Sequence, residues 1–281
     1  MIQSVNNQAE PRIVTEPSSA DEWFVDIHCH CLPGIDDGPA NMSEAIELCR
    51  ALVDDGIGTV IATPHQLGRF DNSNDADQIR EAVRLVNKKL NENNIDLCVL
   101  PGADVRVDER VCDMLRADKI MTVGDGRRYL LLELPAEVLI DIEPLLIELG
   151  RVNVRAIISH PERCRVIVRG PHILEKWLEH SVSLQITAGS LLGEFGPAAQ
   201  EAAWSFLQRG WAQIVATDAH DVCQRRPRMT AAFECIANES GRQVARNLCI
   251  ENPMRILQGA DLPTASEVSI VGYQYGGTNT Q

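Results

Sequence analysis

Histidine and carboxylate side chains recur in this chain at one kind of position, directly after short apolar segments that are typical of β-strands. The first group is a His-x-His pair, His28 and His30, and five of the seven histidines follow such segments. Imidazole and carboxylate ligands without thiolate suit Mn, Fe or Zn in a hydrolytic site. The candidate ligands are His28, His30, Asp37, His65, Asp104, Glu133, His160, Asp218 and His220.

This candidate set is too large for one ion and large enough for two or three, since carboxylates can bridge neighbouring ions. Clustered divalent ions lower the pKa of a shared water and hold the oxygens of a transferring phosphoryl group. A lone histidine at a strand end is more often a hydrogen-bonded structural residue. The prediction of a metal site therefore depends on the ordered set and not on any one member.

Strand alternation sorts the residues around the His-x-His pair. Successive side chains of a strand point to opposite faces, so His28 and His30 share a face, and Asp26 is expected on that face as well. Cys29 and Cys31 are expected on the other face. We therefore do not count these two thiols among the ligands.

Two other motifs point to different chemistry and carry less weight. Cys249 and Arg255 match the C-x5-R spacing of cysteine-based phosphatases, but Asn252-Pro253 between them supplies no glycine-rich phosphate cradle. We interpret Cys249 as a core residue. The segment around Ser190 has no G-x-S-x-G pattern, which argues against a serine nucleophile.

The predicted ligands are carried by alternating strands and helices. The predicted strands are 23–28, 59–63, 97–105, 128–134, 155–160, 183–187 and 213–218. The clearest predicted helices are 43–54, 77–92, 137–149, 197–208 and 226–237. This alternation implies a parallel sheet, and the carboxyl ends of its strands meet at the edge where barrel enzymes build their active sites.

Local signals support the first two helices. Asn41 followed by Glu44 predicts a capping box at the start of helix 43–54. In helix 77–92 one apolar stripe recurs at helical spacing. Its members are Ile79, Val83, Val86 and Leu90.

Composition limits the classes of function. The chain has 281 residues, of which 44% are hydrophobic, and this length suits a single α/β barrel. A formal net charge of -14 argues against nucleic-acid binding through a basic face. The same charge would repel an anionic substrate, so metal ions or a focused set of arginines would have to make the site locally positive.

The chain reads as one domain, 22–263, between a disordered extension, 1–21, and a flexible tail, 264–281. No apolar run is long enough to cross a bilayer, so no membrane insertion is expected. Nine irregularly spaced cysteines without a CxxC pair favour free thiols in a reducing cytoplasm.

Taken together, these motifs resemble the polymerase-and-histidinol-phosphatase (PHP) superfamily and, within it, the metal-dependent protein-tyrosine phosphatases of bacterial capsule and exopolysaccharide loci, the CpsB-like group. The matching stretches are DIHCHCLPGIDDGP (26–39), ATPH (62–65), LLLELP (130–135), SHPERC (159–164), ITAGSLLGEFG (186–196) and ATDAHD (216–221). The resemblance implies a distorted seven-stranded (β/α) TIM-like barrel of the PHP type. It also implies two to three divalent ions, with Mn²⁺ favoured and Fe, Zn, Mg or Co as alternatives.

The resemblance also distributes the ligands over three ions: His28 and His30 with Asp218, Glu133 as a bridging ligand with His160, and Asp37 with His65 and His220. One position departs from the family pattern, because Asp104 stands where the family usually has glutamate after a Gly-Ala pair. Aspartate keeps the carboxylate and shortens its reach by one methylene. We expect the metal site to survive with altered affinity.

Two arginine positions match phosphate-binding residues of the family. Arg163 lies in the HPER motif and corresponds to the first. The second follows the DAH motif, where counting from His220 selects Arg225 and the Arg-Pro pairing selects Arg226. Both stay candidates at this point.

The function implied by the resemblance is hydrolysis of phosphotyrosine on protein. The implied partner is the autophosphorylated tail of a bacterial tyrosine kinase that controls exopolysaccharide synthesis or export. Fold alone does not determine the substrate, so a small-molecule phosphomonoesterase of the histidinol-phosphatase kind is the alternative. A non-catalytic metal-binding scaffold is a third hypothesis, and the complete ligand set argues against it.

Overall fold

Residues 23–71 and 73–263 are described by the computed structural model, and the strands in them pair in parallel. These strands are β1 (Phe24–Cys29), β2 (Ile57–Ala62), β3 (His65–Gln66), β4 (Cys98–Pro101), β5 (Asp104–Arg106), β6 (Tyr129–Glu133), β7 (Arg155–Ser159), β8 (Ser183–Thr187) and β9 (Ala212–Ala216). They form two sheets in the orders β1-β2-β4 and β3-β5-β6-β7-β8-β9. The predicted extension 1–21 and tail 264–281 lie outside the described residues.

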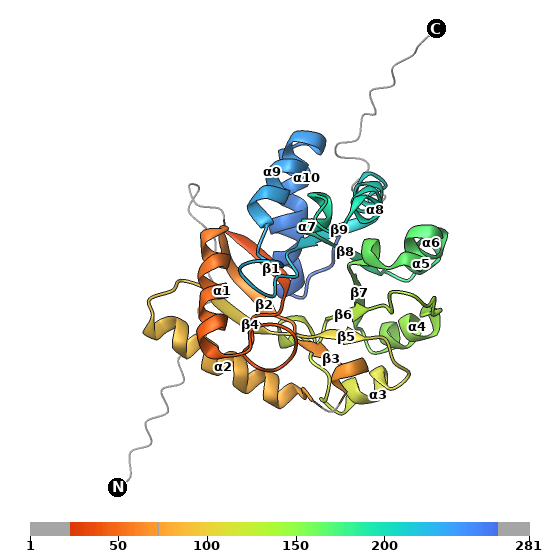
Figure 1. Cartoon of the computed structure of the whole chain (residues 1–281). Helices are drawn as coiled ribbons and strands as arrows, with labels where there is room; N and C mark the ends of the chain where they lie inside the picture. Colours follow the sequence, from red (N-terminus) through yellow and green to blue (C-terminus); the bar gives the residue numbers. More distant parts are fainter. Residues whose placement is uncertain (1–22, 72, 264–281) are drawn as a thin grey trace.

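The two sheets are the parts of one distorted barrel (Figure 1). β2 leads into β3 after a break at 63–64, and β4 leads into β5 after a break at 102–103. A parallel bridge between Cys29 and Ala219 joins the end of β1 to the segment that follows β9. If β2 with β3 and β4 with β5 are each counted as one interrupted strand, the barrel has the seven strands that the sequence predicts. The prediction of one continuous strand over 97–105 was wrong.

Two residues explain the breaks. Pro64 has no N–H to donate to a strand ladder, so β2 cannot continue its pairing through it. At Gly102 a Cβ atom would lie only 2.5 Å from Cγ2 of Ile61, so the backbone approaches β2 too closely for a side chain. Beyond the breaks His65 opens β3, Asp104 opens β5, and the two residues are paired in register. The distortion therefore places two predicted ligands side by side.

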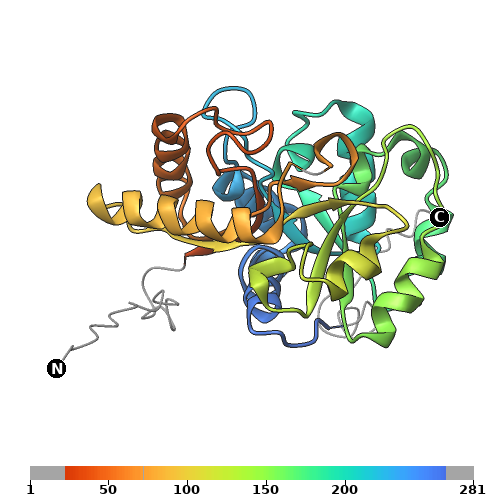
Figure 2. The same cartoon turned by 90° about the horizontal axis from the view of Figure 1, so that it is seen from below.

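Helices cover the outside of the strands, with α1 and α2 beside β1, β2 and β4, and α4, α6 and α8 beside the longer sheet (Figures 1 and 2). The helices are α1 (Met42–Asp54), α2 (Ala76–Glu92), α3 (Val111–Arg116), α4 (Glu143–Arg151), α5 (Arg165–Arg169), α6 (His172–Leu178), α7 (Ala188–Leu191), α8 (Pro197–Gln208), α9 (Met229–Ser240), α10 (Arg242–Arg246) and α11 (Asn252–Leu257). Single turns are η1 (Gly68–Phe70), η2 (Val123–Asp125) and η3 (Pro161–Arg163), and η4 (Asn247–Glu251) is a π-turn. Within the described ranges, none of the helices is both long and apolar enough to span a membrane.

Two predicted helices begin later than expected. The helix predicted at 137–149 begins at Glu143, where Pro144 occupies the first turn that suits a proline. The helix predicted at 226–237 begins at Met229, because Pro227 disfavours helical geometry at the residue before it. The carboxylate of Asp55 accepts hydrogen bonds from the N–H groups of Met229 and Thr230 at 2.5 and 3.2 Å, which caps this later start.

The capping signals are confirmed with one difference. Asn41 caps α1 by accepting hydrogen bonds from the N–H groups of Ser43 and Glu44. The Glu44 carboxylate binds the N–H of Ala40 and the Asn41 amide, so the reciprocal bond of a full capping box is displaced by one residue. The full capping box belongs to α2, and the four residues of its predicted apolar stripe are buried.

Apolar side chains fill both faces of the strands, as the near-continuous apolar runs predict. On β6, Tyr129 and Leu131 belong to the cluster inside the barrel, whereas Leu130 and Leu132 belong to the layer under the helices. Alternation therefore turns Glu133 toward the inside, at the carboxyl end of the strand. The predicted ligand Glu133 thus lies where the apolar interior of the barrel ends.

Candidate metal centre

The nine predicted ligands meet at the carboxyl-terminal edge of the barrel. They contribute atoms to four overlapping groups, in each of which the ligand atoms lie within 4.8 Å of one another. These groups are His30, Asp37, His65 and His220; His28, His30 and Asp104; His28, His160 and Asp218; and His65, Asp104 and Glu133. Residues far apart in the sequence converge because parallel strands end at the same edge.

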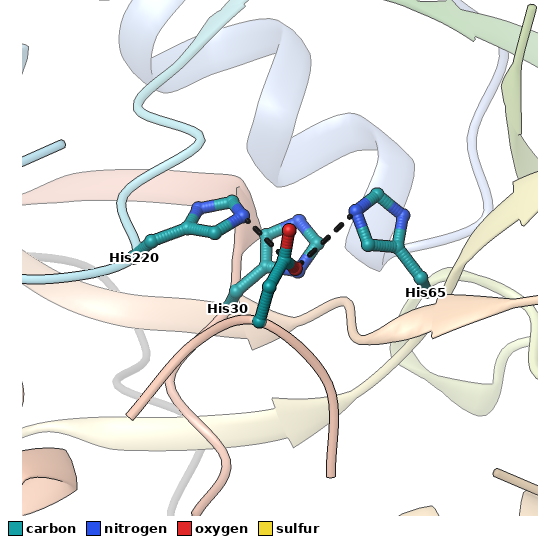
Figure 3. Close-up of side chains that lie close together, drawn as sticks. His30, His65 and His220 are labelled. Carbon is teal, nitrogen blue, oxygen red and sulfur yellow. Dashed lines mark ion pairs between the residues drawn. The ribbon is translucent and has the colours of Figure 1, made fainter. Parts of the chain in front are cut away.

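The outermost group surrounds Asp37, which lies in the loop between β1 and α1. Its Oδ1 lies 3.5 Å from Nε2 of His65 and 3.5 Å from Nε2 of His220. Figure 3 shows the rings of His30, His65 and His220 gathered around one carboxylate. The three residues that the resemblance assigns to one ion, Asp37, His65 and His220, therefore lie in one group.

A buried group lies deeper in the barrel. Nε2 of His28 and Nε2 of His30 are 3.3 Å apart, and Oδ1 of Asp218 is 3.3 Å from the first and 3.4 Å from the second. All three side chains are almost fully excluded from solvent. Three buried donor atoms at this spacing can hold a divalent ion between them.

Asp104 connects the groups. Its Oδ2 lies 3.5 Å from Nδ1 of His65 and 3.7 Å from Nε2 of both His28 and His160. The resemblance assigns Glu133 and His160 to one ion, but they fall into different groups. Asp104 lies between these groups, because it contacts His65, a neighbour of Glu133, and His28, a neighbour of His160. The shorter side chain thus reaches the centre of the cluster in this chain.

The donor set fits divalent cations. Nδ1 of His65 and Oδ2 of Asp104 are buried within the described structure without a hydrogen-bond partner, although they face other ligand atoms. Buried polar atoms are rarely left unpartnered, and a cation between them would satisfy both. Cys29 and Cys31 lie in the apolar layer behind the strands, as expected, so the centre is made of nitrogen and oxygen.

Asp26 does not face the predicted ligands, which corrects the expectation that strict alternation places it on the face of His28 and His30. The pairing of β1 with β2 is irregular between Asp26 and Cys29, and this irregularity breaks the two-residue period. The Asp26 carboxylate accepts hydrogen bonds from the N–H and hydroxyl of Thr217 and from the N–H of His28. Burial raises its pKa to about 7.

A second layer of hydrogen bonds orients the imidazoles. Nδ1 of His28 bonds Oε1 of Gln185 at 2.8 Å, and Nδ1 of His30 bonds Oδ2 of Asp36 at 2.6 Å. Both bonds leave Nε2 free to face the centre. The hydroxyl of Ser159 donates to Oδ1 of Asp104 at 2.9 Å.

Sequence reasoning did not assign these three supporting residues. The resemblance selects Asp37 from the adjacent Asp36-Asp37 pair, and the turn after β1 adds that Asp36 supports the imidazole of His30 while Asp37 faces the outer group. Gln185 is a buried polar residue in an otherwise apolar strand. That contrast is the signal that could have identified it.

The charges of the cluster shift the pKa values of its members. Burial lowers the pKa of His65 to about 4, with a further contribution from His30, and burial together with Arg163 lowers the pKa of His160 to about 4. Burial and the nearby Asp104 raise the pKa of Glu133 to about 7. Neutral imidazoles are the form that binds metals, so His65 and His160 are ready to act as ligands at neutral pH.

Two arginines converge on the centre. Arg163, in η3, and Arg225, in the loop before α9, both donate hydrogen bonds to Oδ2 of Asp218. The guanidinium carbon of Arg163 lies 4.3 Å from the centre of the Phe195 ring, and Nη1 of Arg225 lies 2.8 Å from Nε2 of His220. The neighbouring candidate Arg226 is exposed and lies outside the cavity lining.

A cavity of about 260 Å³ opens above the cluster. Four arginines stand among its lining residues, which gives this acidic protein a local source of positive charge. The described lining residues are Asp37, His65, Leu67, Arg69, Phe70, Arg106, Glu133, His160, Arg163, Asp218 and Arg225. Arg106 was not predicted; it lies two residues beyond Asp104 on β5, and its Nη2 is 3.2 Å from Oε2 of Glu133.

The remaining candidate nucleophile is buried elsewhere. Cys249 belongs to the main apolar core, as predicted, and burial raises the pKa of its thiol. A thiol with a raised pKa is a poor nucleophile at neutral pH. The chemistry available at the cavity is therefore that of the imidazoles, carboxylates and arginines.

The fold and site thus define a parallel α/β barrel with a multi-ligand centre for divalent cations. The profile of the family described as "Capsular polysaccharide synthesis, CpsB/CapC" matches residues 24–258, and the chain belongs to this family. It is 35% identical over 222 residues to the tyrosine-protein phosphatase YwqE of Bacillus subtilis, a match that covers 79% of this chain and 87% of the relative. It is 31% identical to the putative tyrosine-protein phosphatase CapC of Staphylococcus aureus, covering 72% and 79% of the two chains.

A solved structure supports the same grouping. The chain superposes with a TM-score of 0.82 and 33% identity on a structure from work on YwqE of Bacillus subtilis and CpsB of Streptococcus pneumoniae, described as metal-dependent tyrosine phosphatases. The superposition covers 85% of this chain and 96% of the other. The predicted fold class, the distorted α/β barrel, is confirmed.

Proposed function

We propose that this protein is a metal-dependent phosphatase that hydrolyses phosphotyrosine on proteins. The observation that carries the proposal is the convergence of nine nitrogen and oxygen ligands and two arginines beneath one cavity. The names of the relatives support the substrate class. The family description, capsular polysaccharide synthesis, supports a role in making an exopolysaccharide.

Two to three divalent ions, with Mn²⁺ favoured, would be held by the nine ligands. We assign His28, His30 and Asp218 to a buried ion, and Asp37, His65 and His220 to an outer ion. Glu133, His160 and Asp104 would complete the centre between them. When bound, such ions would supply an activated water as the nucleophile and positive charge for the phosphoryl oxygens, so no covalent intermediate on the protein would be required.

The chain's own residues position the substrate. Arg163 and Arg225 present planar guanidinium groups that can each donate two hydrogen bonds to phosphoryl oxygens. Their common contact with Asp218 keeps both groups directed at the floor of the cavity. The leaving group is a phenolate with a pKa near ~10, so it needs less help from a general acid than an alkoxide does.

The proposed partner is a phosphotyrosine protein, and more narrowly the tail of a bacterial tyrosine kinase that controls polysaccharide synthesis or export. We place the protein in the cytoplasm, where such a tail would be exposed. All nine cysteines lie within the described part of the chain and are free thiols, which agrees with a reducing compartment.

A substrate panel tests the proposal. Turnover of a phosphotyrosine peptide, histidinol phosphate and an aryl phosphate should be measured with and without Mn²⁺. We expect Mn²⁺-dependent turnover with the highest kcat/KM for the phosphotyrosine peptide. A preference for histidinol phosphate would favour the small-molecule alternative, and metal binding without any turnover would favour a scaffold.

A further inference from the structure

The cavity above the metal centre has a single apolar wall. Of the described residues that line it, Leu67 and Phe70 are apolar, and the others are acidic, basic or histidine. Both apolar residues come from the short segment between β3 and α2, which includes η1. An apolar part of a substrate would therefore be complementary to the surface formed by Leu67 and Phe70.

The backbone of this segment is unusual. Leu67 has a φ of 65° and is buried, and Gly68 follows with a φ of 59°. A leucine rarely adopts a positive φ, and such conformations persist where the surrounding structure holds them, often at functional sites. The turn brings Phe70 back over His65, with ring centroids 5.4 Å apart and an angle of 13° between the rings.

The position of Phe70 is held by its neighbours. The guanidinium carbon of Arg69 lies 4.5 Å from the Phe70 ring centre, and Arg69 also pairs with Asp37. A Cβ at Gly68 would lie 3.2 Å from Cγ of Arg106, so this turn packs closely against β5. The aromatic ring is thus fixed beside the outer group of ligands and does not extend freely into solvent.

We propose that Phe70 contacts the aromatic ring of the substrate and makes the site selective for aryl over alkyl phosphate esters. The inference rests on the proposed function, since it assigns the arginines and the metal centre to the phosphoryl group and Phe70 to its substituent. Aromatic rings attract one another in offset or edge-to-face arrangements with centroids roughly 4.5–7 Å apart. Such a contact distinguishes a phenyl from an aliphatic substituent.

Binding of two inert ligands tests the contact without relying on turnover. Phenylphosphonate and methylphosphonate share the anionic group and differ in the ring. Their dissociation constants should be measured by calorimetry with the full chain loaded with Mn²⁺. We expect Phe70→Leu to weaken phenylphosphonate binding by about three- to tenfold and to leave methylphosphonate unchanged, while Phe70→Tyr keeps the preference.

Phe195→Leu provides a matched control, because Phe195 packs on the Arg163 guanidinium. This variant should weaken both phosphonates alike, since it acts on the group that holds phosphate. Metal content of each variant should be measured in parallel, because Phe70 also stacks on His65. Equal losses for both phosphonates in Phe70→Leu, or no loss for either, would overturn the proposal.

Kinetics separate this inference from the proposed function. kcat/KM should be measured for the phosphotyrosine and phosphoserine forms of one peptide, with the wild type and with Phe70→Leu. The substitution should lower kcat/KM for the phosphotyrosine form alone. Absence of turnover for every phosphate ester would refute the proposed function, and the phosphonate preference would still decide the role of Phe70.

Discussion

Arg163 and Arg225 donate hydrogen bonds to the same atom, Oδ2 of Asp218. The two arginines come from the ends of different strands, and their meeting point lies at the floor of the cavity. A phosphoryl group has several oxygens to place, and two guanidinium groups on one side can bind more than one of them. This convergence distinguishes the pair from arginines that form surface ion pairs.

Removal of either arginine should therefore impair catalysis more than metal binding. We expect Arg225→Ala and Arg163→Ala each to lose about 2–4 kcal/mol of transition-state stabilisation, as for other lost oxyanion donors, with metal content and the circular dichroism spectrum unchanged. Lysine should rescue only in part, because it supplies charge without the planar fork.

Arg226→Ala is the matched control for Arg225→Ala, since the two residues are adjacent and Arg226 is exposed. Its kcat/KM for a phosphotyrosine peptide should stay near that of the wild type. A larger loss in Arg226→Ala than in Arg225→Ala would contradict the assignment of the second arginine.

Activity should depend on divalent metal and not on a thiol. Chelation should abolish turnover and Mn²⁺ should restore it, because the nine ligands would hold the ions that activate water. His160→Ala should be nearly inactive, whereas Cys249→Ser should retain turnover if it folds. As a second measurement, turnover of the wild type should be followed after thiol alkylation. Loss of turnover in alkylated protein that keeps its metal would show that activity depends on a thiol.

Asp104 should be essential for its carboxylate and tolerant of length. Asp104→Ala should lower both the metal stoichiometry and the activity, because Oδ2 of Asp104 lies among three histidines. Asp104→Glu should keep both to a large extent, since glutamate keeps the carboxylate and lengthens its reach by one methylene. Metal analysis of the purified variants measures the first effect, and full metal content in the alanine variant would place Asp104 outside the ligand set.

Gln185 should tune metal affinity without touching the metal. Gln185→Leu removes the hydrogen bond to Nδ1 of His28, and the loss of such a partner typically weakens metal binding by about 10–100-fold. Gln258→Leu, at an exposed position, serves as the control. Competition with a chelator of known affinity provides the measurement, and equal affinities in the two variants would show that Gln185 does not orient His28.

The convergence of the candidate ligands could be predicted from the sequence, because all nine lie in order at or near strand ends. The carboxyl ends of parallel strands must meet, so residues such as His65 and Glu133 come together whatever the details of packing. The strand sequences before these residues are apolar on both faces, which predicts that both faces of the sheet are covered. The predicted helix starts near Pro144 and Pro227 were wrong, because helix starts depend on local capping.

Only the tertiary structure decided between neighbours. The irregular pairing of β1 turns Asp26 toward Thr217 and leaves His28 and His30 to the metal centre, and no count along the strand reveals such an irregularity. Arg225 and Arg226 are equivalent as residue types. They differ because the backbone of Arg225 accepts a hydrogen bond from the N–H of His220, and this contact closes the loop with one side chain inward and the other in solvent.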